Sequence, residues 1–320
     1  MRHTDDLINS LLLSYSMKII VGDIHACKAE LEELLDKIGF GPDDQVIALG
    51  DIFDRGPDNR GILDLFSSSP QFSTLKGNHE RKHILISESK CKASVSQLIT
   101  KEELGRDYPR LMEFVRNLPN YIELDEAILV HGALEPDIAL ENQHENILVS
   151  SISGERFLNK LGRPWYELIK VNKPVIFGHK VYDEPLVFQD KVYGIDTGCC
   201  LGKSLTAITL PGFRTYSVKA RKAYWPAAGK EFLSQHSELA KPKKAKTLDE
   251  LGVDVQATYE KIVEYAGKLK SQTGSRKEFA DEVKKRNLPS IIFRAYEGKL
   301  TLDFVKKIDI SKLGEFAEYK

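Results

Sequence analysis

Cysteine is scarce in this chain, and the four that occur do not form a disulfide framework. Cys27, Cys91, Cys199 and Cys200 include no Cys-x-x-Cys pair, and two of them are adjacent in sequence. Small secreted domains that depend on disulfides are far richer in cysteine. The sequence therefore predicts reduced thiols in a cytoplasmic protein, with Cys27, Cys199 and Cys200 packed as small side chains.

Long hydrophobic runs are also missing. No stretch reaches the roughly 18 apolar residues of a membrane span, so we expect no membrane partner. Residues 1–16 contain a short apolar patch, but Asp5 and Asp6 stand where a signal peptide carries basic residues. We expect this segment to be an N-terminal extension. A core-strand pattern begins at Met17, which leaves open whether translation starts at Met1 or Met17.

The chain also lacks an excess of positive or negative charge. Lysine and arginine number 46 against 47 aspartates and glutamates, for a formal net charge of −1. This balance argues against a protein dedicated to coating nucleic acid, and it leaves a local basic patch open. With 42% hydrophobic residues among 320, the chain can bury one large core, or one core and a small appendage.

The first ninety residues alternate between strand and helix patterns. We predict strands at residues 19–21, 45–53 and 72–76, because each is a short apolar or β-branched run. Helices are predicted at 28–38 and 59–66, where apolar residues recur at helical spacing. This alternation is typical of an α/β sheet with crossover helices.

The following part of the chain is predicted to be richer in antiparallel strands. Residues 121–124 and 127–131 have the pattern of a hairpin, and strands resume from 174 to 218. Residues 142–161 show little periodicity, and we expect them to form a surface excursion near the functional site. The main domain is expected to span residues 17–233.

The C-terminal part differs in charge from the rest. Residues 234–249 carry a run of lysines with little apolar content, which predicts a basic linker. Helical patterns recur within residues 250–320, which we expect to form a small, mostly helical domain. From Lys241 onward, 18 lysines and arginines face 13 acidic residues. This surplus is suited to contact nucleic acid or a protein partner; the alternative is a stabilising appendage.

Polar residues gather where the predicted strands end. In open α/β sheets, ligands collect at the carboxyl ends of the strands. The residues found there are, in order, Asp23 and His25, Asp51 and Asp54, Asn78 and His79, His131, His179, and Asp196. Each alone has an ordinary explanation, such as a turn aspartate or a core histidine. Together, they would be electrostatically costly to bury without a cation. Carboxylates, imidazoles and an amide oxygen suit hard or borderline divalent ions.

Three sequence blocks resemble the signature of the calcineurin-like metallophosphoesterases. They are Gly-Asp-Ile-His at 22–25, Gly-Asp-Ile-Phe-Asp-Arg-Gly at 50–56 and Gly-Asn-His-Glu at 77–80. His131 and His179, each beside a glycine, follow in the expected order. The resemblance covers roughly residues 17–225 and is closest to the phosphoprotein-phosphatase branch of the family.

The resemblance implies a fold and a metal centre. The fold is α/β, with two packed mixed β-sheets flanked by helices, to which this chain would add a small helical C-terminal appendage. Two divalent ions, manganese or else iron, zinc, nickel or cobalt, would lie at the strand ends. The ligands would be Asp23, His25 and Asp51 for one ion, and Asp51, Asn78, His131 and His179 for the other. Asp51 would thus bridge the two ions.

A mechanism follows from such a centre. Two bridged cations lower the pKa of the water between them and place it for in-line attack on phosphorus. Arg55, together with Asn78, would hold the substrate phosphate. His79, oriented by Asp54, would protonate the leaving oxygen. The alternative for Arg55 is a salt bridge to Asp54 or Asp58.

Further features bear on the branch of the family. Lys180 and Val181 follow His179, so the second histidine of many phosphodiesterase relatives is missing. Residues 195–218 resemble a bacterial subgroup that includes diadenosine tetraphosphatases and the phosphatase module of polynucleotide kinase–phosphatases. In that subgroup Asp196 would support the site without binding metal; the alternative is a plain turn aspartate.

Two departures from the family pattern are visible, and one expected residue is not identified. Ala26 stands where the family has glycine, and Ala133 stands where a second glycine is common. Both are small, so we expect the backbone to be unchanged. Arg81, Arg156 and Arg163 are candidates for a second phosphate-binding arginine, and each has a solvated surface position as its alternative.

Three functions follow as hypotheses. The leading one is a phosphomonoesterase of the serine/threonine protein phosphatase type that acts on phosphorylated protein. The second is a nucleotide-directed enzyme that removes phosphate from RNA ends or cleaves dinucleoside polyphosphates. The third is a catalytically inactive binding scaffold, which the sequence disfavours because no expected ligand position is missing.

Overall fold

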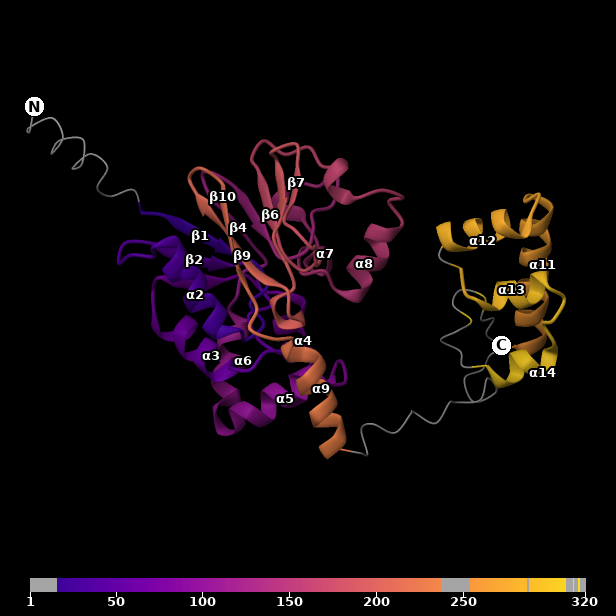
Figure 1. Ribbon diagram of the computed structural model, residues 1–320, viewed down its shortest axis with the longest axis horizontal. Helices are drawn as coiled ribbons and strands as arrows, with labels where there is room; N and C mark the ends of the chain where they lie inside the picture. The colour runs from indigo at the N-terminus through magenta and orange to yellow at the C-terminus, as the bar shows by residue number, and fades with distance from the viewer. Residues whose placement is uncertain (1–15, 237–253, 287, 309–312, 314–315, 317–320) are drawn as a thin grey trace, which may run out of the picture. The chain divides into compact units, whose positions relative to one another are not determined.

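The computed structural model describes residues 16–236, 254–286, 288–308, 313 and 316. The chain divides into two compact units, Met1–His236 and Ser237–Lys320 (Figure 1). Nearly all of the predicted N-terminal extension and most of the predicted basic linker lie outside the described residues. The boundaries predicted for those two segments therefore stay predictions.

The first unit contains two five-stranded sheets, the first with the order β10-β9-β1-β2-β3. Its strands are β1 (Lys18–Val21), β2 (Gln45–Ala48), β3 (Phe72–Thr74), β9 (Ser204–Leu210) and β10 (Arg214–Lys219). β1, β2 and β3 are parallel, whereas β9 pairs antiparallel with β1 and with β10. The strand–helix alternation predicted for the first ninety residues is confirmed.

The second sheet has the order β4-β5-β6-β8-β7. Its strands are β4 (Tyr121–Glu123), β5 (Ile128–Val130), β6 (Val175–Phe177), β7 (Leu186–Phe188) and β8 (Val192–Gly194). The hairpin predicted here is confirmed, because β4 and β5 pair antiparallel. The expectation of mainly antiparallel strands is only partly right, since β5, β6 and β8 run parallel. All three are buried along their whole length, which is the pattern of central parallel strands.

Helices connect these strands and pack on the sheets (Figure 1). They are α2 (Lys28–Ile38), α3 (Asn59–Ser68), α4 (Asn78–Ser87), α5 (Val95–Leu104), α6 (Tyr108–Arg116), α7 (Glu145–Leu148), α8 (Ile152–Asn159) and α9 (Tyr224–Gln235). Short 3-10 turns occupy Gly105–Asp107, Leu140–Asn142, Trp165–Glu167 and Cys199–Leu201 (η4). Across the described ranges, every helix is too short or too polar to span a bilayer.

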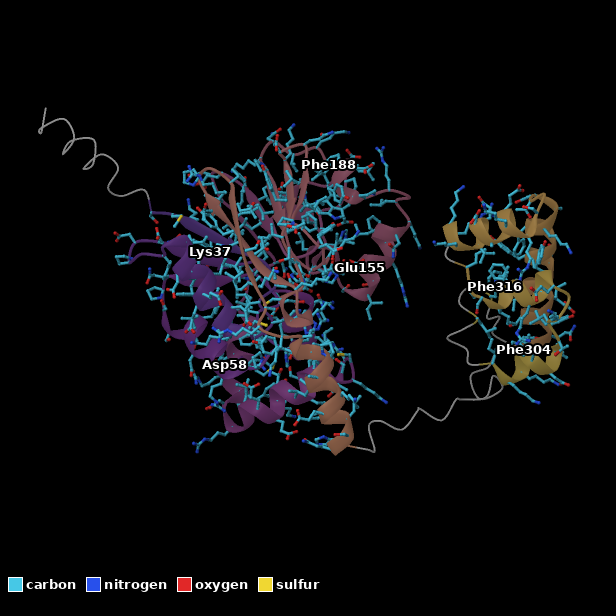
Figure 2. All side chains as sticks on the ribbon, in the orientation of Figure 1. Lys37, Asp58, Glu155, Phe188, Phe304 and Phe316 are labelled. Carbon is cyan, nitrogen blue, oxygen red and sulfur yellow. The ribbon has the colours of Figure 1, made fainter. Side chains whose placement is uncertain are left out.

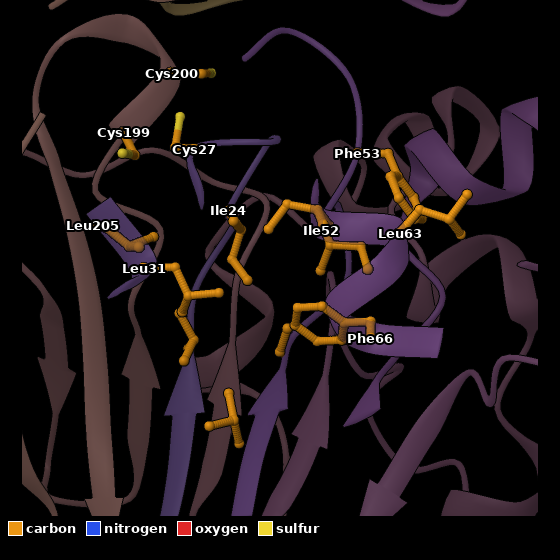
Figure 3. Close-up of a cluster of buried hydrophobic side chains, with 14 of the residues drawn as sticks. Ile24, Cys27, Leu31, Ile52, Phe53, Leu63, Phe66, Cys199, Cys200 and Leu205 are labelled. Atoms are coloured by element: carbon orange, nitrogen blue, oxygen red, sulfur yellow. The ribbon is translucent and has the colours of Figure 1, made fainter. Parts of the chain in front are cut away.

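The core lies on both faces of the first sheet, because neighbouring residues of a strand point to opposite sides. Ile19 and Val21 of β1 pack with residues of α2, α3 and α6 in one buried cluster, part of which Figure 3 shows. Ile20 belongs instead to a cluster that includes Leu129 and Ile176 of the second sheet. The two sheets therefore pack face to face. This is the two-sheet fold that the sequence predicts.

Strand β2 ends at Ala48, earlier than the predicted strand at 45–53. Gly50 has a φ of 95°, and a Cβ placed there would lie only 2.7 Å from the backbone nitrogen of Gly77. Glycine tolerates both the conformation and the close approach. The chain therefore turns sharply, and Asp51 and the residues after it form a loop at the carboxyl edge of the sheet.

The second unit has a small helical core of its own. Its helices are α11 (Val255–Ser271), α12 (Arg276–Lys285), α13 (Ile291–Tyr296) and α14 (Leu302–Lys307). They bury a cluster that includes Phe279, Ile292 and Phe316, the last of which is labelled in Figure 2. Asp254, Ser275 and Thr301 accept hydrogen bonds from the first turns of α11, α12 and α14. The helical C-terminal appendage is confirmed.

Candidate metal centre

The candidate site lies where loops from the two sheets meet, at the carboxyl ends of their strands. The loops after β1 and β2 carry Asp23, His25 and Asp51, and Asn78 begins helix α4 after β3. The loops after β5, β6 and β8 carry His131, His179 and Asp196. Asn78 and His179 are half-buried, and the other five are buried. The fold therefore brings all the predicted ligand residues to one place.

Asp51 stands at the middle of this group. Its carboxylate oxygens lie 3.8 Å from Nε2 of His25 and 3.5 Å from Nε2 of His131. Nε2 of His79 is 3.9 Å away. Two sets of possible ligand atoms result, each with its atoms within 4.8 Å of one another: His25, Asp51 and His79, and Asp51, His131 and His179. Asp51 belongs to both sets.

Asn78 and Asp23 both contact His179. The side-chain oxygen of Asn78 is 3.0 Å from Nε2 of His131 and 2.8 Å from Nδ1 of His179. Oδ1 of Asp23 accepts a hydrogen bond from the backbone N–H of His179 at 2.9 Å. Asn78 therefore adds an oxygen to the second set of ligand atoms. Within the described residues, Asp23 belongs to neither set.

Backbone carbonyls fix how two buried histidines face the centre. Nδ1 of His25 donates to the carbonyl of Phe53, and Nδ1 of His131 donates to that of Leu49, both at 2.9 Å. Burial lowers the pKa of His25 to about 3 and the pKa of His131 to about 4. Both rings are therefore neutral near pH 7 and present the lone pair of Nε2. This is the form of histidine that binds a metal ion.

The buried carboxylates provide a test of whether cations fit. Burial raises the pKa of Asp23 well above its usual value, and Asp196 and Asp51 raise it further. Burial also raises the pKa of Asp196 to about 6. NH1 of Arg55 lies 2.9 Å from Nε2 of His25, so a cationic group already faces that lone pair. Divalent ions fit this donor set, because they would offset the crowded negative charge.

His79 is held by a carboxylate instead of a carbonyl. Its Nδ1 donates to Oδ2 of Asp54 at 2.6 Å. Burial alone lowers the pKa of His79, but Asp51 and Asp54 outweigh it, and the pKa is raised above 6.5. Asp54 is fully buried, and three further side chains hydrogen-bond to it: His83, Gln97 and Thr100. The predicted pairing of His79 with Asp54 is therefore present in the structure.

Glu80 has a role that sequence reasoning missed. Its buried carboxylate accepts hydrogen bonds from the backbone N–H groups of Asp51 at 2.8 Å, Ile52 at 3.0 Å and Gly77 at 2.9 Å. It thereby joins the loop after β2 to the start of α4. The signal lay in the Gly-Asn-His-Glu block, because an acidic residue at the third position of a helix is typical of a capping box.

The backbone of the centre is strained at several points. Non-glycine residues with positive φ include His25, Asp51, Asp54, Arg55 and His179. Each such conformation costs on the order of 1–3 kcal/mol, and such residues cluster at functional sites. Ala26, where the family has glycine, also has a positive φ of 55°. The alanine therefore keeps the glycine-like turn.

The alternatives for Asp196 and Arg55 can be compared with their contacts. Oδ1 of Asp196 accepts a hydrogen bond from the backbone N–H of Gly198 at 2.9 Å, so this residue shapes a turn. It also acts electrostatically on the centre, because its charge raises the pKa of Asp23. Within the part of the chain that the structure describes, no ion pair joins Arg55 to Asp54 or Asp58.

A cavity of about 690 Å³ lies beside the centre. Asn78 and His179 line it, together with residues of the segment 150–159. The excursion predicted at 142–161 therefore lies near the site, as expected. Of the three candidate arginines, Arg81 and Arg156 line the cavity, and Arg163 is not among its lining residues.

Glu155, labelled in Figure 2, is a second residue that sequence reasoning missed. It lines the same cavity, and its Oε1 lies 3.4 Å from Nε2 of His179. The same Oε1 accepts a hydrogen bond from the hydroxyl of Ser150 at 2.8 Å. The ring of His179 is therefore held between Glu155 on Nε2 and Asn78 on Nδ1. No periodicity or motif in the segment signals this role.

Comparison with known proteins identifies the family. The profile described as calcineurin-like phosphoesterase matches residues 18–192, more than half of the chain. The asymmetrical bis(5′-nucleosyl)-tetraphosphatase PrpE of Oceanobacillus iheyensis is 26% identical over 239 residues, covering 65% of this chain and 94% of the relative. The symmetrical bis(5′-nucleosyl)-tetraphosphatase of Vibrio parahaemolyticus is 26% identical over 251 residues, covering 59% and 93%.

A solved structure agrees with this assignment. The crystal structure of a provisionally assigned diadenosine tetraphosphatase superposes with a TM-score of 0.55 at 26% identity, and covers 65% of this chain and 95% of that one. The same two-sheet fold thus occurs in both, with side chains suited to divalent metal ions at the strand ends of this chain. The chain belongs to the calcineurin-like phosphoesterases and is a metal-dependent hydrolase of phosphate esters.

Proposed function

We propose that this centre holds two divalent metal ions with Asp51 between them. The observation that carries the proposal is the membership of Asp51 in two sets of close ligand atoms, one with His25 and His79 and one with His131 and His179. A carboxylate has two oxygens and can therefore contact two ions at once. Bound ions would supply a water of lowered pKa and offset the charge of the phosphoryl oxygens.

The remaining ligands are proposed from their positions. Asp23 shares a loop with His25, and Asn78 lies within hydrogen-bond distance of both His131 and His179. With Asp51, these residues give the two ligand sets expected from the sequence. Oxygen and imidazole donors without thiolate suit manganese, with iron, zinc, nickel and cobalt as alternatives. The same Asn78 side chain lines the cavity, and there it would contact a substrate phosphate.

His79 is proposed as the general acid. Its Nδ1 is held by Asp54, so Nε2 faces the centre, 3.9 Å from a carboxylate oxygen of Asp51. Asp51 and Asp54 raise the pKa of this ring, which favours its protonated form. A protonated imidazole can give that proton to the leaving oxygen as the bond to phosphorus breaks.

Arg55 is proposed to bind phosphate oxygens. Its NH1 donates to the lone pair of Nε2 of His25. A metal-bound His25 no longer has that lone pair to offer, so the guanidinium needs another acceptor. Phosphate oxygens match its planar donors in pairs, which gives the contact both strength and direction.

For the substrate, we infer a dinucleoside polyphosphate first. The relatives named above are bis(5′-nucleosyl)-tetraphosphatases. The wall of the cavity combines cationic Arg81, Lys82 and Arg156 with apolar Leu85 and Ile152. Cationic groups suit a polyphosphate chain, and an apolar side chain such as Ile152, 76% exposed, suits a base. This reverses the order of hypotheses that the sequence alone favours.

A phosphomonoesterase of the serine/threonine phosphatase type is the second candidate. The observation that favours it is Val181, which stands two residues after His179, where many phosphodiesterase relatives carry an additional histidine. A phosphorylated side chain would contact the metal centre and would not have to extend along the cavity. Removal of phosphate from RNA ends is a third possibility with the same chemistry.

A substrate panel separates these functions. Purified protein with Mn²⁺ is assayed on diadenosine tetraphosphate, a phosphoserine peptide and an RNA 3′-phosphate. We expect kcat/KM to be at least about tenfold higher for diadenosine tetraphosphate, because its polyphosphate chain and base would contact the cationic and apolar side chains of the cavity wall. A preference for the peptide would favour the second candidate. Absence of turnover with Mn²⁺, Ni²⁺, Co²⁺ and Fe²⁺ would reject the activity itself.

A matched pair of arginine variants tests the role of the cavity. Arg156→Ala removes a cation from its wall, and we expect kcat/KM for diadenosine tetraphosphate to fall about tenfold or more. Hydrolysis of p-nitrophenyl phosphate, which has no polyphosphate chain for Arg156 to contact, should be unchanged. Arg163→Ala removes the same charge outside the cavity lining and should leave both rates as they are.

A further inference from the structure

A second cluster of possible ligand atoms lies close to the loop that carries His25. Cys27, Glu30 and Cys199 place two sulfur atoms and a carboxylate oxygen within 4.8 Å of one another. We call these three residues the thiol cluster. Figure 3 shows the side chains of Cys27 and Cys199 together, with Cys200 nearby. All three members of the cluster are buried, with exposures of 0%, 0% and 1%.

Glu30 has one satisfied and one unsatisfied carboxylate oxygen. Oε1 accepts hydrogen bonds from the hydroxyl of Tyr224 at 2.7 Å and from the backbone N–H of Arg221 at 3.0 Å. Oε2 is buried and has no hydrogen-bond partner among the described residues. A buried carboxylate oxygen without a partner is costly. A bound cation would give Oε2 of Glu30 a partner.

We propose that the thiol cluster is a third metal site, which binds a thiophilic divalent ion such as Zn²⁺. Two sulfurs and one carboxylate oxygen are the donors that Zn²⁺ accepts in tetrahedral sites, with the fourth position left for another ligand. Binding releases one proton from each thiol as the ion enters, so two positive charges leave and two arrive. The net charge of the buried cluster is unchanged, while Oε2 of Glu30 gains a partner.

A disulfide between Cys27 and Cys199 is the competing use of the same sulfurs. It would require an oxidant, and it would leave Oε2 of Glu30 buried without a partner. The orphaned oxygen therefore favours the metal ion over the disulfide.

The thiol cluster also differs from the centre around Asp51 in kind. That centre offers oxygen and nitrogen donors alone, and thiolates select softer ions. Three segments meet at the cluster: the end of the loop of His25, the first turn of α2 and the turn η4 that follows Asp196. The sulfur of Cys27 lies 3.4 Å from the backbone carbonyl of His25. An ion bound here would tie together two of the loops that form the catalytic centre.

Cobalt titration of the purified, reduced protein tests the proposal. Co²⁺ bound by thiolates gives an intense sulfur-to-metal charge-transfer absorption, which oxygen and nitrogen ligands cannot produce. We expect this band to appear and to reach the intensity of one thiolate-bound Co²⁺ per chain, after subtraction of the Co²⁺ that the centre around Asp51 takes up. The band should disappear when Zn²⁺ is added, because Zn²⁺ binds such sites more tightly. The readout does not depend on catalytic activity, so it is independent of the function proposed above.

Single substitutions show which side chains produce the charge-transfer band. Cys27→Ser and Cys199→Ser should each abolish or shift it, and Glu30→Gln should keep it while weakening Co²⁺ binding about tenfold or more. Cys91→Ser, which removes a partly exposed thiol outside the cluster, should leave it unchanged. Circular dichroism checks that each variant is folded. Because a buried serine can impair folding, X-ray absorption of the zinc-loaded wild type provides a second measurement, with sulfur neighbours expected at about 2.3 Å.

Three results would overturn the proposal. The first is the absence of a charge-transfer band in the wild type. The second is a band that survives unchanged in Cys27→Ser and Cys199→Ser but is lost in Cys91→Ser. The third is a Cys27–Cys199 disulfide, identified by mass spectrometry in protein purified without reductant, that persists when zinc is supplied during expression.

Discussion

Three buried histidines of the metal centre, His25, His79 and His131, are of two kinds, although all three lie near the same carboxylate of Asp51. The pKa of His25 is lowered to about 3 and that of His131 to about 4, whereas the pKa of His79 is raised. Burial lowers the pKa of all three and cannot explain the difference. Asp51 raises the pKa of His79 most, and Asp54 raises it further. The rings differ in the partner of Nδ1, which is a backbone carbonyl for His25 and His131 and the carboxylate of Asp54 for His79.

This difference separates two chemical roles within a few ångströms. A ring that donates to a neutral carbonyl gains little from being charged, so it stays neutral and offers a lone pair to a metal ion. A ring that donates to a buried carboxylate is stabilised as a cation and can donate a proton. The group that accepts the hydrogen bond from Nδ1 therefore helps to distinguish a metal ligand from a general acid.

The largest effect is expected from a substitution of Asp51, whose carboxylate lies near both kinds of histidine. Asp51→Asn keeps the shape of the side chain but removes the charge between the two ligand sets. We expect turnover of p-nitrophenyl phosphate to fall by about a thousandfold or more, because both proposed ions lose a ligand. Metal content, measured after gel filtration, should fall with it.

Asp196→Asn is the matched control for that change. It also removes one buried carboxylate, but from a residue that lies outside both ligand sets within the described part of the chain. We expect a much smaller loss of activity. Equal losses in the two variants, or near wild-type turnover in Asp51→Asn, would reject the bridging role.

Much of this centre could be predicted from the sequence, because its residues lie in short blocks at strand ends. Asp23, Asp51 and Asn78 each follow an apolar run and stand beside a glycine, and parallel strands bring their carboxyl ends to one edge. The order of the blocks also identified the family. The fold class followed from the same strands.

The parts that could not be predicted depend on contacts across the fold. Gln97 and Thr100 reach Asp54 from α5, and no spacing in the sequence indicates which residues of an amphipathic helix meet a given side chain. Cys27 and Cys199 lie far apart in sequence, so their proximity to Glu30 appears only in three dimensions. The parallel pairing of β6 with β8 was missed because short apolar strands carry no sign of direction.

A smaller effect, selective for substrate, is expected at the acid. His79→Ala removes the proton donor but none of the proposed metal ligands. We expect hydrolysis of esters with poor leaving groups, such as alkyl phosphates, to slow by about a hundredfold or more. p-Nitrophenolate leaves without a proton, so its ester should be much less affected. Equal losses for both substrates would argue that His79 acts on the metal ions instead.

The smallest change is expected in the pH dependence of activity after a substitution of Asp54. This residue accepts the hydrogen bond from Nδ1 of His79. The acid must be protonated, so activity is lost as pH rises through the pKa of His79. Asp54 helps to raise that pKa above 6.5, and Asp54→Asn should therefore move the basic limb of the kcat/KM profile to lower pH. The measurement is a pH–rate profile for an alkyl phosphate ester. Thr100→Val removes a hydrogen bond to Asp54 but keeps its charge, so its basic limb should stay at the wild-type pH. A basic limb that moves equally in both variants, or in neither, would show that the carboxylate does not set the protonation of His79.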